Sequence, residues 1–363
     1  SRVSGSEIIS SNSKTSYNGN YGLNASWTLY NGNKRVKTIQ QEKLNNQMAE
    51  LDVATSENNI QESIAQVYIQ ILYAAESVKV NENTLQVSIA QRDRGQELLN
   101  AGSIAKSDLA QLEAQVSTDR YQLVTAQATL EDYKLQLKQL LELDGENEMN
   151  VYLPALSDEN VLLPLPTKKD VYMSALTLRP EIEASKLSVE ASELGIDIAK
   201  AGYLPTISLS AGIGTNHTSG SDFTFGEQVK NGWNNSIGVS VSVPIFNNRQ
   251  TKSAVQKAKL QRETSLLSLL DEQKTLYKTI EGLWLDANSA QQRYAAANEK
   301  LKSTQISYDL ISEQFNLGMK NTVELLTEKN NLLQAQQEQL QAKYMAILNT
   351  QLLKFYQGDK LAL

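Results

Sequence analysis

Three stretches of the chain alternate apolar residues with small polar ones at a period of two. They cover residues 22–30, 206–213 and 237–245, and Ser, Thr, Asn or Gly fill the polar positions except at Tyr30 and Pro244. This period is typical of a β-strand whose two faces meet different surroundings. A length of about 9–10 residues suits a tilted strand that crosses a bilayer, although an ordinary sheet with one buried face has the same pattern. We predict three strands, with residues 215–235 as an exposed loop rich in Gly, Ser and Asn.

A different period follows the first and the last of these strands. Apolar residues are spaced by four and three, which averages 3.5 residues and indicates a left-handed coiled coil. All six prolines lie outside these stretches, as an unbroken helix requires. We predict helices over 33–101 and 249–317, each about 100 Å long at the rise of an α-helix. The two stripes are Ile60, Ile64, Val67, Ile71, Ala74 and Val78, and Leu276, Ile280, Leu283, Ala287, Ala290 and Tyr294.

Each long helix is expected to end at a glycine and to reverse. Gly102 and Gly318 supply the positive φ that a C-terminal cap needs. Return helices are predicted over about 106–142 and 322–356, the first capped by Ser103 or Ser107 and the second by Asn321 or Thr322. Residues 143–178 are expected to be irregular, and a further helix is expected over about 180–201.

The chain also matches itself when it is shifted by 216 residues without a gap. Both turn glycines and both strand ends coincide under this shift, which chance identities in a biased composition would not explain. We therefore predict a duplication in which each copy is a strand, a long helix, a turn and a return helix. The helix near 180–201 has no counterpart in the first copy. We accordingly expect that an N-terminal part of roughly 40 residues or more, with a first helix and most of a first strand, is absent from this sequence.

Composition narrows the possible functions. The formal net charge of −7 argues against a nucleic-acid partner, and no apolar run is long enough for a transmembrane helix. The chain has no Cys and one His, His217, so we expect no metal site and no thiol chemistry. No phosphate-binding loop, triad or pair of acidic residues points to catalysis, and we expect neither catalytic residues nor a cofactor.

The order of these elements resembles the TolC family of outer-membrane efflux proteins, over essentially the whole chain. Asn248 departs from the family, which commonly has Gly there. The tips resemble the family's turn from a Gly to an acid six residues later. The matching motifs are Arg179-Pro180-Glu181-Ile182, Leu204-Pro205, Val243-Pro244-Ile245-Phe246, Gly102 to Asp108-Leu109, and Gly318 to Glu324-Leu325.

The resemblance implies a mixed α and β fold that assembles as a homotrimer. Three protomers would close a 12-stranded β-barrel in the outer membrane, continued through the periplasm by a 12-helix α-barrel. An open sheet edge in lipid would be costly, which independently favours assembly. The expected parts are barrel strands and external loops (1–30 and 204–246), a first coiled-coil hairpin (31–142), an equatorial linker and helix (143–203), a second hairpin (247–357) and a C-terminal tail (358–363).

The resemblance also assigns roles to residues at the two turns. Contact with a periplasmic adaptor falls to Ala101, Gly102 and Ser103, and to Leu317, Gly318 and Met319. Three copies of Glu324 would form a ring of negative charge that lines the closed aperture and favours cations. This ring should be weaker here, because Thr327 replaces a second acid. Asp108, Phe315 and Lys320 would make the gate contacts between helices. For both sets the alternative is ordinary helix reversal and solvated charge.

The implied function is a passive exit duct in the outer membrane. An inner-membrane pump of the RND, ABC or MFS type would supply the energy, and a periplasmic membrane-fusion adaptor would bridge the two. Trp27, Tyr30 and Phe246 stand at strand ends, where aromatic residues anchor barrels to lipid, or where they pack at the end of any sheet. The alternative function is a periplasmic coiled-coil adaptor or scaffold without a pore.

Overall fold

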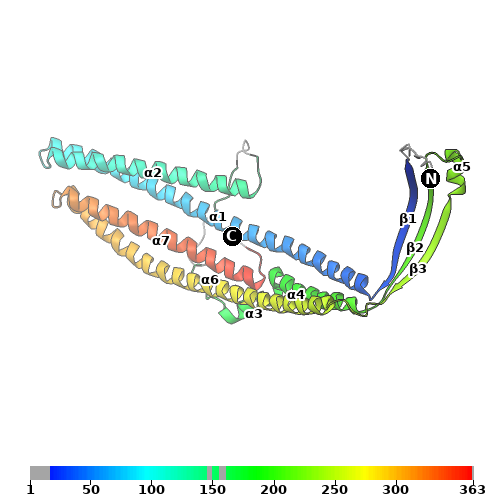
Figure 1. Cartoon of the computed structure of the whole chain (residues 1–363). Helices are drawn as coiled ribbons and strands as arrows, with labels where there is room; N and C mark the ends of the chain where they lie inside the picture. The colour runs from blue at the N-terminus through cyan, green and yellow to red at the C-terminus, as the bar shows by residue number, and fades with distance from the viewer. Residues whose placement is uncertain (1–16, 145–148, 155–160, 362–363) are drawn as a thin grey trace, which may run out of the picture. The chain divides into compact units, whose positions relative to one another are not determined.

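The computed structural model describes residues 17–144, 149–154 and 161–361, and the chain divides into two compact units (Figure 1). The first unit contains Ser1–Asn46 and Leu187–Leu266, and the second contains Gln47–Lys186 and Leu267–Leu363. No helix among the described residues is long and apolar enough to cross a membrane.

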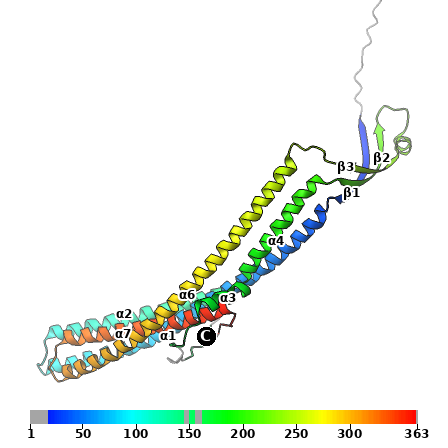
Figure 2. The ribbon, with the colours of Figure 1, turned by 90° about the horizontal axis from the view of Figure 1, so that it is seen from below.

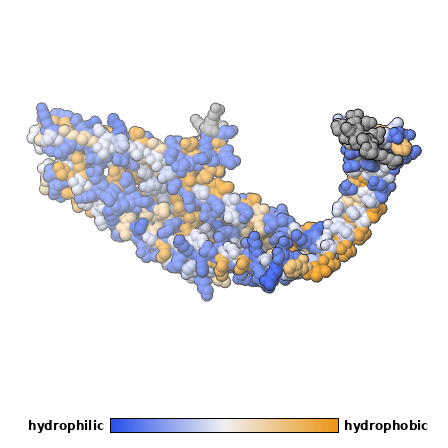
Figure 3. All heavy atoms as spheres, in the orientation of Figure 1, coloured by the Kyte–Doolittle hydropathy of each residue, from blue (hydrophilic) through white to orange (hydrophobic). Residues whose placement is uncertain are grey.

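The first unit holds a three-stranded antiparallel sheet in the order β1-β2-β3. Its strands are β1 (Asn18–Asn31), β2 (Thr206–Thr218) and β3 (Asn234–Ser242). Trp27 pairs with Leu209, and Leu209 pairs with Val239, so the alternating apolar residues share one face of the sheet. Trp27 is 62% exposed and Val239 66% exposed, and Figure 3 shows apolar side chains gathered along the strands. The three predicted strands are confirmed, and their apolar face is uncovered.

Several predicted details of this unit were wrong. β3 ends at Ser242, so residues 243–245 are not part of the strand, in keeping with Pro244, which has no N–H for a ladder. β2 extends to Thr218, and the expected loop contains a short helix, α5 (Phe225–Asn231). This helix begins with a capping box in which Thr224 and Glu227 bond each other's backbone N–H groups.

The strands lead into the long helices through turns with the same geometry in both copies. Gly32 and Asn33 both have positive φ, at 67° and 63°. The residues 216 positions later, Asn248 and Arg249, have φ of 51° and 61°. Asn is among the residues that tolerate this conformation best, which explains why it can replace the expected Gly. At Gly32 a Cβ would meet Leu204 Cβ at 2.8 Å.

The helices repeat the same shift. α1 (Lys34–Asn100) and α6 (Gln250–Asn316) have equal lengths, and α2 (Lys106–Leu140) and α7 (Thr322–Gln357) follow their turns. The predicted hairpins and the repeat of long helix, turn and return helix are confirmed, with α2 ending two residues early. The expected coincidence of the strand ends was wrong, because β1 ends at Asn31 and β3 already at Ser242. We call α1 with α2 the first hairpin and α6 with α7 the second hairpin. Their two turns lie at the same end of the second unit (Figures 1 and 2).

The segment between the copies is more ordered than expected. Residues 168–178, predicted to be irregular, form α3 (Lys168–Leu178), whose N-cap Thr167 accepts a hydrogen bond from Asp170 N. α4 (Pro180–Lys200) follows almost directly. The irregular part is held against the long helices by side chains that bond its backbone carbonyls. These bonds are Trp284 Nε1 to Pro166 O (3.0 Å), Gln291 Nε2 to Leu163 O (2.8 Å) and Tyr68 OH to Tyr152 O (2.8 Å).

The core of the second unit consists of separate clusters along the helices. One joins α3, α4, α6 and α7 through residues that include Val171, Ile182, Ile280 and Leu353, all fully buried. The predicted stripe of the second hairpin faces inward, with Leu276, Ile280, Ala287, Ala290 and Tyr294 buried.

A buried ionic group lies beside this cluster. The Arg179 guanidinium bonds the carboxylates of Glu181 (2.8 Å) and Glu62 (3.3 Å) and lies 4.4 Å from the Tyr356 ring centroid. Its side chain is 7% exposed. Burial raises the pKa of Glu62, against the opposing effect of Arg179, and raises the pKa of Tyr356 to about 12. One cation therefore holds two carboxylates where α1 and α4 meet.

Replacing Arg179 should therefore destabilise this unit strongly. Arg179→Met leaves two carboxylates half-desolvated without a cation, and we expect a loss of about 3–5 kcal/mol in the free energy of unfolding. Glu62→Gln should cost far less, because burial disfavours the Glu62 charge and Arg179 keeps its ion pair with Glu181. The measurement is chemical denaturation of the purified protein. Lys186→Met, which removes an exposed pair with Glu183, is the control and should change stability by less than about 1 kcal/mol. Equal losses for Arg179→Met and Lys186→Met would contradict this account.

Candidate functional site at the two hairpin turns

Both hairpins reverse through the same hydrogen-bonded turn. In the first, Gly102 N bonds Leu99 O (2.9 Å) and Ser103 N bonds Leu98 O (2.8 Å). In the second, Gly318 N bonds Phe315 O (2.9 Å) and Met319 N bonds Gln314 O (2.8 Å). Both glycines have φ of 75°. This is the Schellman pattern, in which the turn itself satisfies the last carbonyls of the helix.

The turns project side chains that the chain leaves uncovered. Leu317 is 68% exposed and Met319 is 70% exposed. Their counterparts in the first turn, Ala101 and Ser103, are also exposed but are small. The two tips therefore share a backbone and differ in chemistry, because only the second presents two large apolar side chains.

The second turn also holds a cluster of polar side chains at the start of α7. Asn321 caps the helix by accepting from Glu324 N (2.9 Å), and Glu324 accepts from Asn321 N (3.3 Å). Lys320 Nζ lies 2.6 Å from Glu324 Oε1. The hydrogen bond from Lys320, and then that from the Asn321 N–H, hold the pKa of Glu324 below its ordinary value. Glu324 is therefore ionised and partly neutralised within its own chain.

The first turn is capped differently from what was expected. The N-cap of α2 is Ala105, and the Asp108 carboxylate accepts from Ala105 N at 3.0 Å. The predicted caps Ser103 and Ser107 were wrong for α2. For α7, Asn321 is the cap and Thr322 is the buried first residue of the helix. Asp108 thus acts as the local counterpart of Glu324.

The structure separates the residues expected at the gate. Lys320 and Glu324 come together, whereas Asp108 lies at the other turn and caps its own helix. Phe315 is 2% exposed and packs in an apolar cluster that joins the two hairpins. The buried members of this cluster are Leu98, Leu112, Phe315 and Leu325. Phe315 therefore fixes the end of the second hairpin against the first.

Sequence reasoning missed a buried ionic group farther from the turns. The Lys329 ammonium of α7 contacts Asp119 Oδ2 of α2 and Ser88 Oγ of α1. All three residues are at most 4% exposed. Burial lowers the pKa of Lys329, while Asp119 favours its charged form. A signal existed, since Lys329 occupies the apolar stripe of α7 between Leu325 and Leu332, at spacings of four and three.

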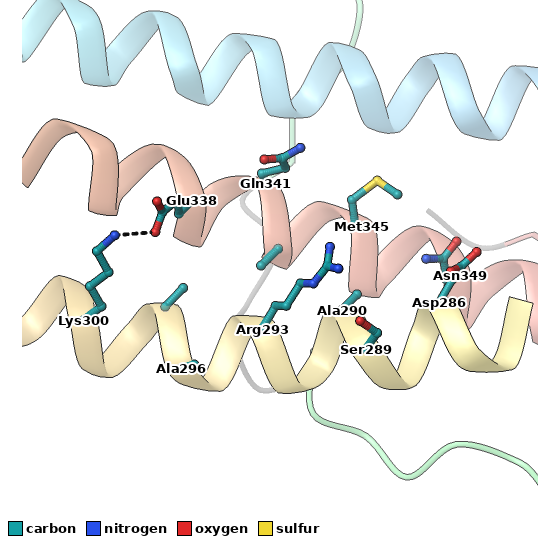
Figure 4. A pocket seen from close by; sticks show the side chains of 12 residues that line it. Asp286, Ser289, Ala290, Arg293, Ala296, Lys300, Glu338, Gln341, Met345 and Asn349 are labelled. Carbon is teal, nitrogen blue, oxygen red and sulfur yellow. Dashed lines mark hydrogen bonds and ion pairs between the residues drawn. The ribbon is translucent and has the colours of Figure 1, made fainter.

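An open groove of about 550 Å³ runs between α6 and α7 (Figure 4). Arg293 projects into it, and Lys300 and Glu338 close an ion pair of 2.7 Å at one end. Within residues 17–144, 149–154 and 161–361, no three His, Asp or Glu side chains gather as a metal site would require.

Comparison with known proteins gives the context of these features. The family model described as outer membrane efflux protein matches residues 1–142 and 171–358. Outer membrane efflux protein BepC of Brucella suis is 25% identical over 80% of this chain and 61% of its own length. Outer membrane protein TolC of Escherichia coli is 25% identical over 87% of this chain and 64% of its own length. The chain spans less than two thirds of the length of either relative.

Solved structures share the fold. A crystal structure of CusC superposes with a TM-score of 0.81, 20% identity, and coverage of 98% of this chain and 81% of that one. The outer membrane protein VceC of Vibrio cholerae gives a TM-score of 0.76 at 15% identity, over 96% of this chain and 88% of that one. At these identities the likeness establishes the fold alone.

The turn glycines provide a test of the site's backbone. A Cβ at position 318 meets nothing within 4 Å, so Gly318→Ala changes only the backbone energy at φ 75°. We expect a loss of about 1–2 kcal/mol in the free energy of unfolding. Gly282 lies inside α6, where a Cβ also meets nothing, so Gly282→Ala should stabilise by about 0.5–1 kcal/mol. Chemical denaturation measures both, and a Gly318→Ala variant as stable as Gly282→Ala would refute the left-handed turn.

Proposed function

The chain belongs to the outer membrane efflux protein family, and from this premise we propose that it is one protomer of a passive homotrimeric exit duct. In this proposal the sheet forms part of a barrel in the outer membrane, and the hairpins form a hollow column in the periplasm. An inner-membrane pump supplies energy, and a periplasmic adaptor connects it to the column. The observation that carries the proposal is a sheet with an uncovered apolar face, in which β1 and β3 are each followed by a long hairpin.

The sheet supports a lipid-facing role through the contrast between its faces. Ile237, Val239 and Val241 alternate along β3 and are 83%, 66% and 61% exposed. The opposite face carries small polar residues such as Ser208 and Ser240, which pair across β2 and β3. Exposing so many apolar side chains to water would be unfavourable, whereas lipid on one side and water on the other suits both faces. The strand edges would then pair with neighbouring protomers, because unpaired backbone groups in lipid are costly.

The hairpins support a column through apolar residues that one protomer leaves exposed. Leu260 and Leu267 on α6 are 69% and 67% exposed, and Tyr121 and Val124 on α2 are 69% and 58% exposed. An isolated amphipathic hairpin would place such residues in its core. Neighbouring hairpins from other copies would cover them in a closed ring, as heterologous contacts between identical subunits do.

The turns are proposed to meet the adaptor, with Leu317 and Met319 as the main contacts. They are the large apolar side chains at the tips, and exposed apolar side chains of this kind mark protein interfaces. Ala101, Gly102, Ser103 and Gly318 would complete the surface. Glu324 would lie near the aperture, where three copies produce a ring of negative charge that favours cations. The intrachain bond from Lys320 should weaken that ring.

Adaptor contact should depend on the apolar residues of the second turn. Leu317→Asp with Met319→Asp should abolish copurification of the adaptor and reduce export, because two charges replace the apolar contact. The matched control is the repeat-related pair Ala101→Asp with Ser103→Asp, for which we expect a smaller loss. Trimer content on non-denaturing gels should remain unchanged in both. Full adaptor binding by the Leu317→Asp, Met319→Asp protein would overturn the docking role.

Conductance tests the proposed function itself. Purified protein in a planar bilayer should produce trimeric channels with a preference for cations, and Glu324→Lys should move the reversal potential toward anion preference. Glu131→Lys, an exposed change in α2 far along the chain from either turn, is the control and should leave the potential unchanged. An unchanged potential in Glu324→Lys would remove Glu324 from the aperture. A protein that stays in water without detergent and passes no ions would instead support the adaptor or scaffold alternative.

A further inference from the structure

The two hairpins of one chain are joined by a set of polar contacts that we call the internal seam. Its buried part is the Lys329 ammonium with Asp119 and Ser88. Around it, three side chains of the first hairpin donate to the second. These bonds are Gln91 Nε2 to Tyr308 OH (2.8 Å), Gln115 Nε2 to Asn330 Oδ1 (3.5 Å) and Arg94 NH2 to Asn316 O (3.4 Å). At this seam the first hairpin supplies an acidic groove between α1 and α2, and the second hairpin supplies the cation that enters it.

The second hairpin carries the equivalent groove, and in this chain it is open. A hollow of about 340 Å³ between α6 and α7 is lined by residues that include Thr304, Ser307 and Asn331. These positions lie 216 residues after Ser88, Gln91 and Gln115, which line the groove of the first hairpin. Its charged lining residues are Lys300 and Glu328. The repeat therefore places an unfilled copy of the seam on the far side of the second hairpin.

The first hairpin carries the equivalents of the residues that enter the groove. Glu113 on α2 corresponds to Lys329, and Arg92 on α1 corresponds to Tyr308. Glu113 is exposed, and the Arg92 side chain is 36% exposed and pairs with Asp93 at 2.6 Å. The charges therefore differ at the positions equivalent to Lys329 and Asp119. The acidic Glu113 replaces the entering Lys329, and the uncharged Ala335 replaces Asp119.

The open groove matches these reversed charges. Lys300 lies one turn before Thr304, and its ammonium, already 2.7 Å from Glu338, keeps donors for a second carboxylate (Figure 4). Glu328 corresponds to Leu112, which belongs to the apolar cluster against which Tyr308 packs. At the open groove Glu328 would replace a member of that cluster, and arginine would replace Tyr308. Both entering charges, Glu113 and Arg92, meet an opposite charge.

We propose that this groove, at Lys300, Thr304 and Glu328, receives Glu113 and Arg92 of a second copy of this chain. The inference rests on the proposed trimer, in which the first hairpin of one copy follows the second hairpin of another. A head-to-tail contact of this kind repeats around a ring and closes it. The resulting seam between protomers has the backbone arrangement of the internal seam with its charges exchanged.

The exchange of charges also disfavours the other pairings between copies. A foreign first hairpin that entered the acidic groove would bring Glu113 to Asp119, and a foreign second hairpin that entered the open groove would bring Lys329 to Lys300. Both arrangements place like charges together, which disfavours them. A first hairpin of one copy should therefore pair with a second hairpin of another, although the two hairpins share one backbone.

Crosslinking between introduced cysteines tests the contact, and the chain has no Cys to interfere. Glu113→Cys with Thr304→Cys should yield covalent dimers and trimers in native membranes with a short bifunctional thiol reagent, because a lysine side chain spans the internal counterpart of this contact and the gap is too wide for a direct disulfide. The control is Arg120→Cys with Thr304→Cys, which moves the first thiol two turns, about 10 Å, along α2 and should give monomers. A trimer on non-denaturing gels without crosslinks in the first pair would overturn the inference and leave the proposed function standing. Absence of any trimer would overturn both.

Charge reversal gives a second measurement. Lys300→Glu should lower the trimer fraction about two- to fivefold for a partly exposed ion pair, and adding Glu113→Lys should restore it. A double variant no better than Lys300→Glu alone would count against the contact.

Discussion

One protomer cannot cover its own apolar surface. The strands leave one apolar face of the sheet open, and the long helices leave residues such as Leu260, Leu310 and Val124 exposed. A helix of 67 residues has far more side-chain surface than one partner helix can bury. On the proposed function, the remaining surface meets lipid or other copies of the chain. The core is accordingly a series of small clusters spaced along the hairpins.

Two hairpins with the same backbone could pair between copies in more than one way. On the inferred contact between copies, the difference in charge would favour one of them. Lys329, Asp119 and Ser88 lock one seam where the alternative partners would bring like charges together. A buried ion pair contributes little net stability, but a mismatched partner leaves a buried charge without a counter-ion, which is costly. On this inference, a few side-chain differences between the copies set a pairing preference that the shared backbone does not set.

The parts of the fold that could be predicted from sequence are those set by local physics. The ends of α1 and α6 follow from Gly102 and Gly318, which supply the positive φ of the turns, and from the absence of proline between the ends. The parts that could not be predicted depend on contacts distant in sequence. α3 is stabilised by packing on α6 and α7. The N-terminus of α2 is capped by the Asp108 carboxylate at Ala105, so the preference for Ser at an N-cap gave the wrong residue. Lys329 stood in an apolar stripe, but only the structure shows that Asp119 meets it.

The turns show how one backbone supports two chemistries. Each turn satisfies its own carbonyls and its own helix N-terminus, so neither needs its exposed side chains for folding. Those side chains are free to differ, and they do, with Leu317 and Met319 in one turn and Ala101 and Ser103 in the other. In a ring of alternating hairpins, large apolar tips would then recur at every second position. On the proposed function, an adaptor would find three strong apolar contacts and three weak ones. The backbone of the docking surface would be close to sixfold symmetric, and the side chains would reduce this symmetry to threefold.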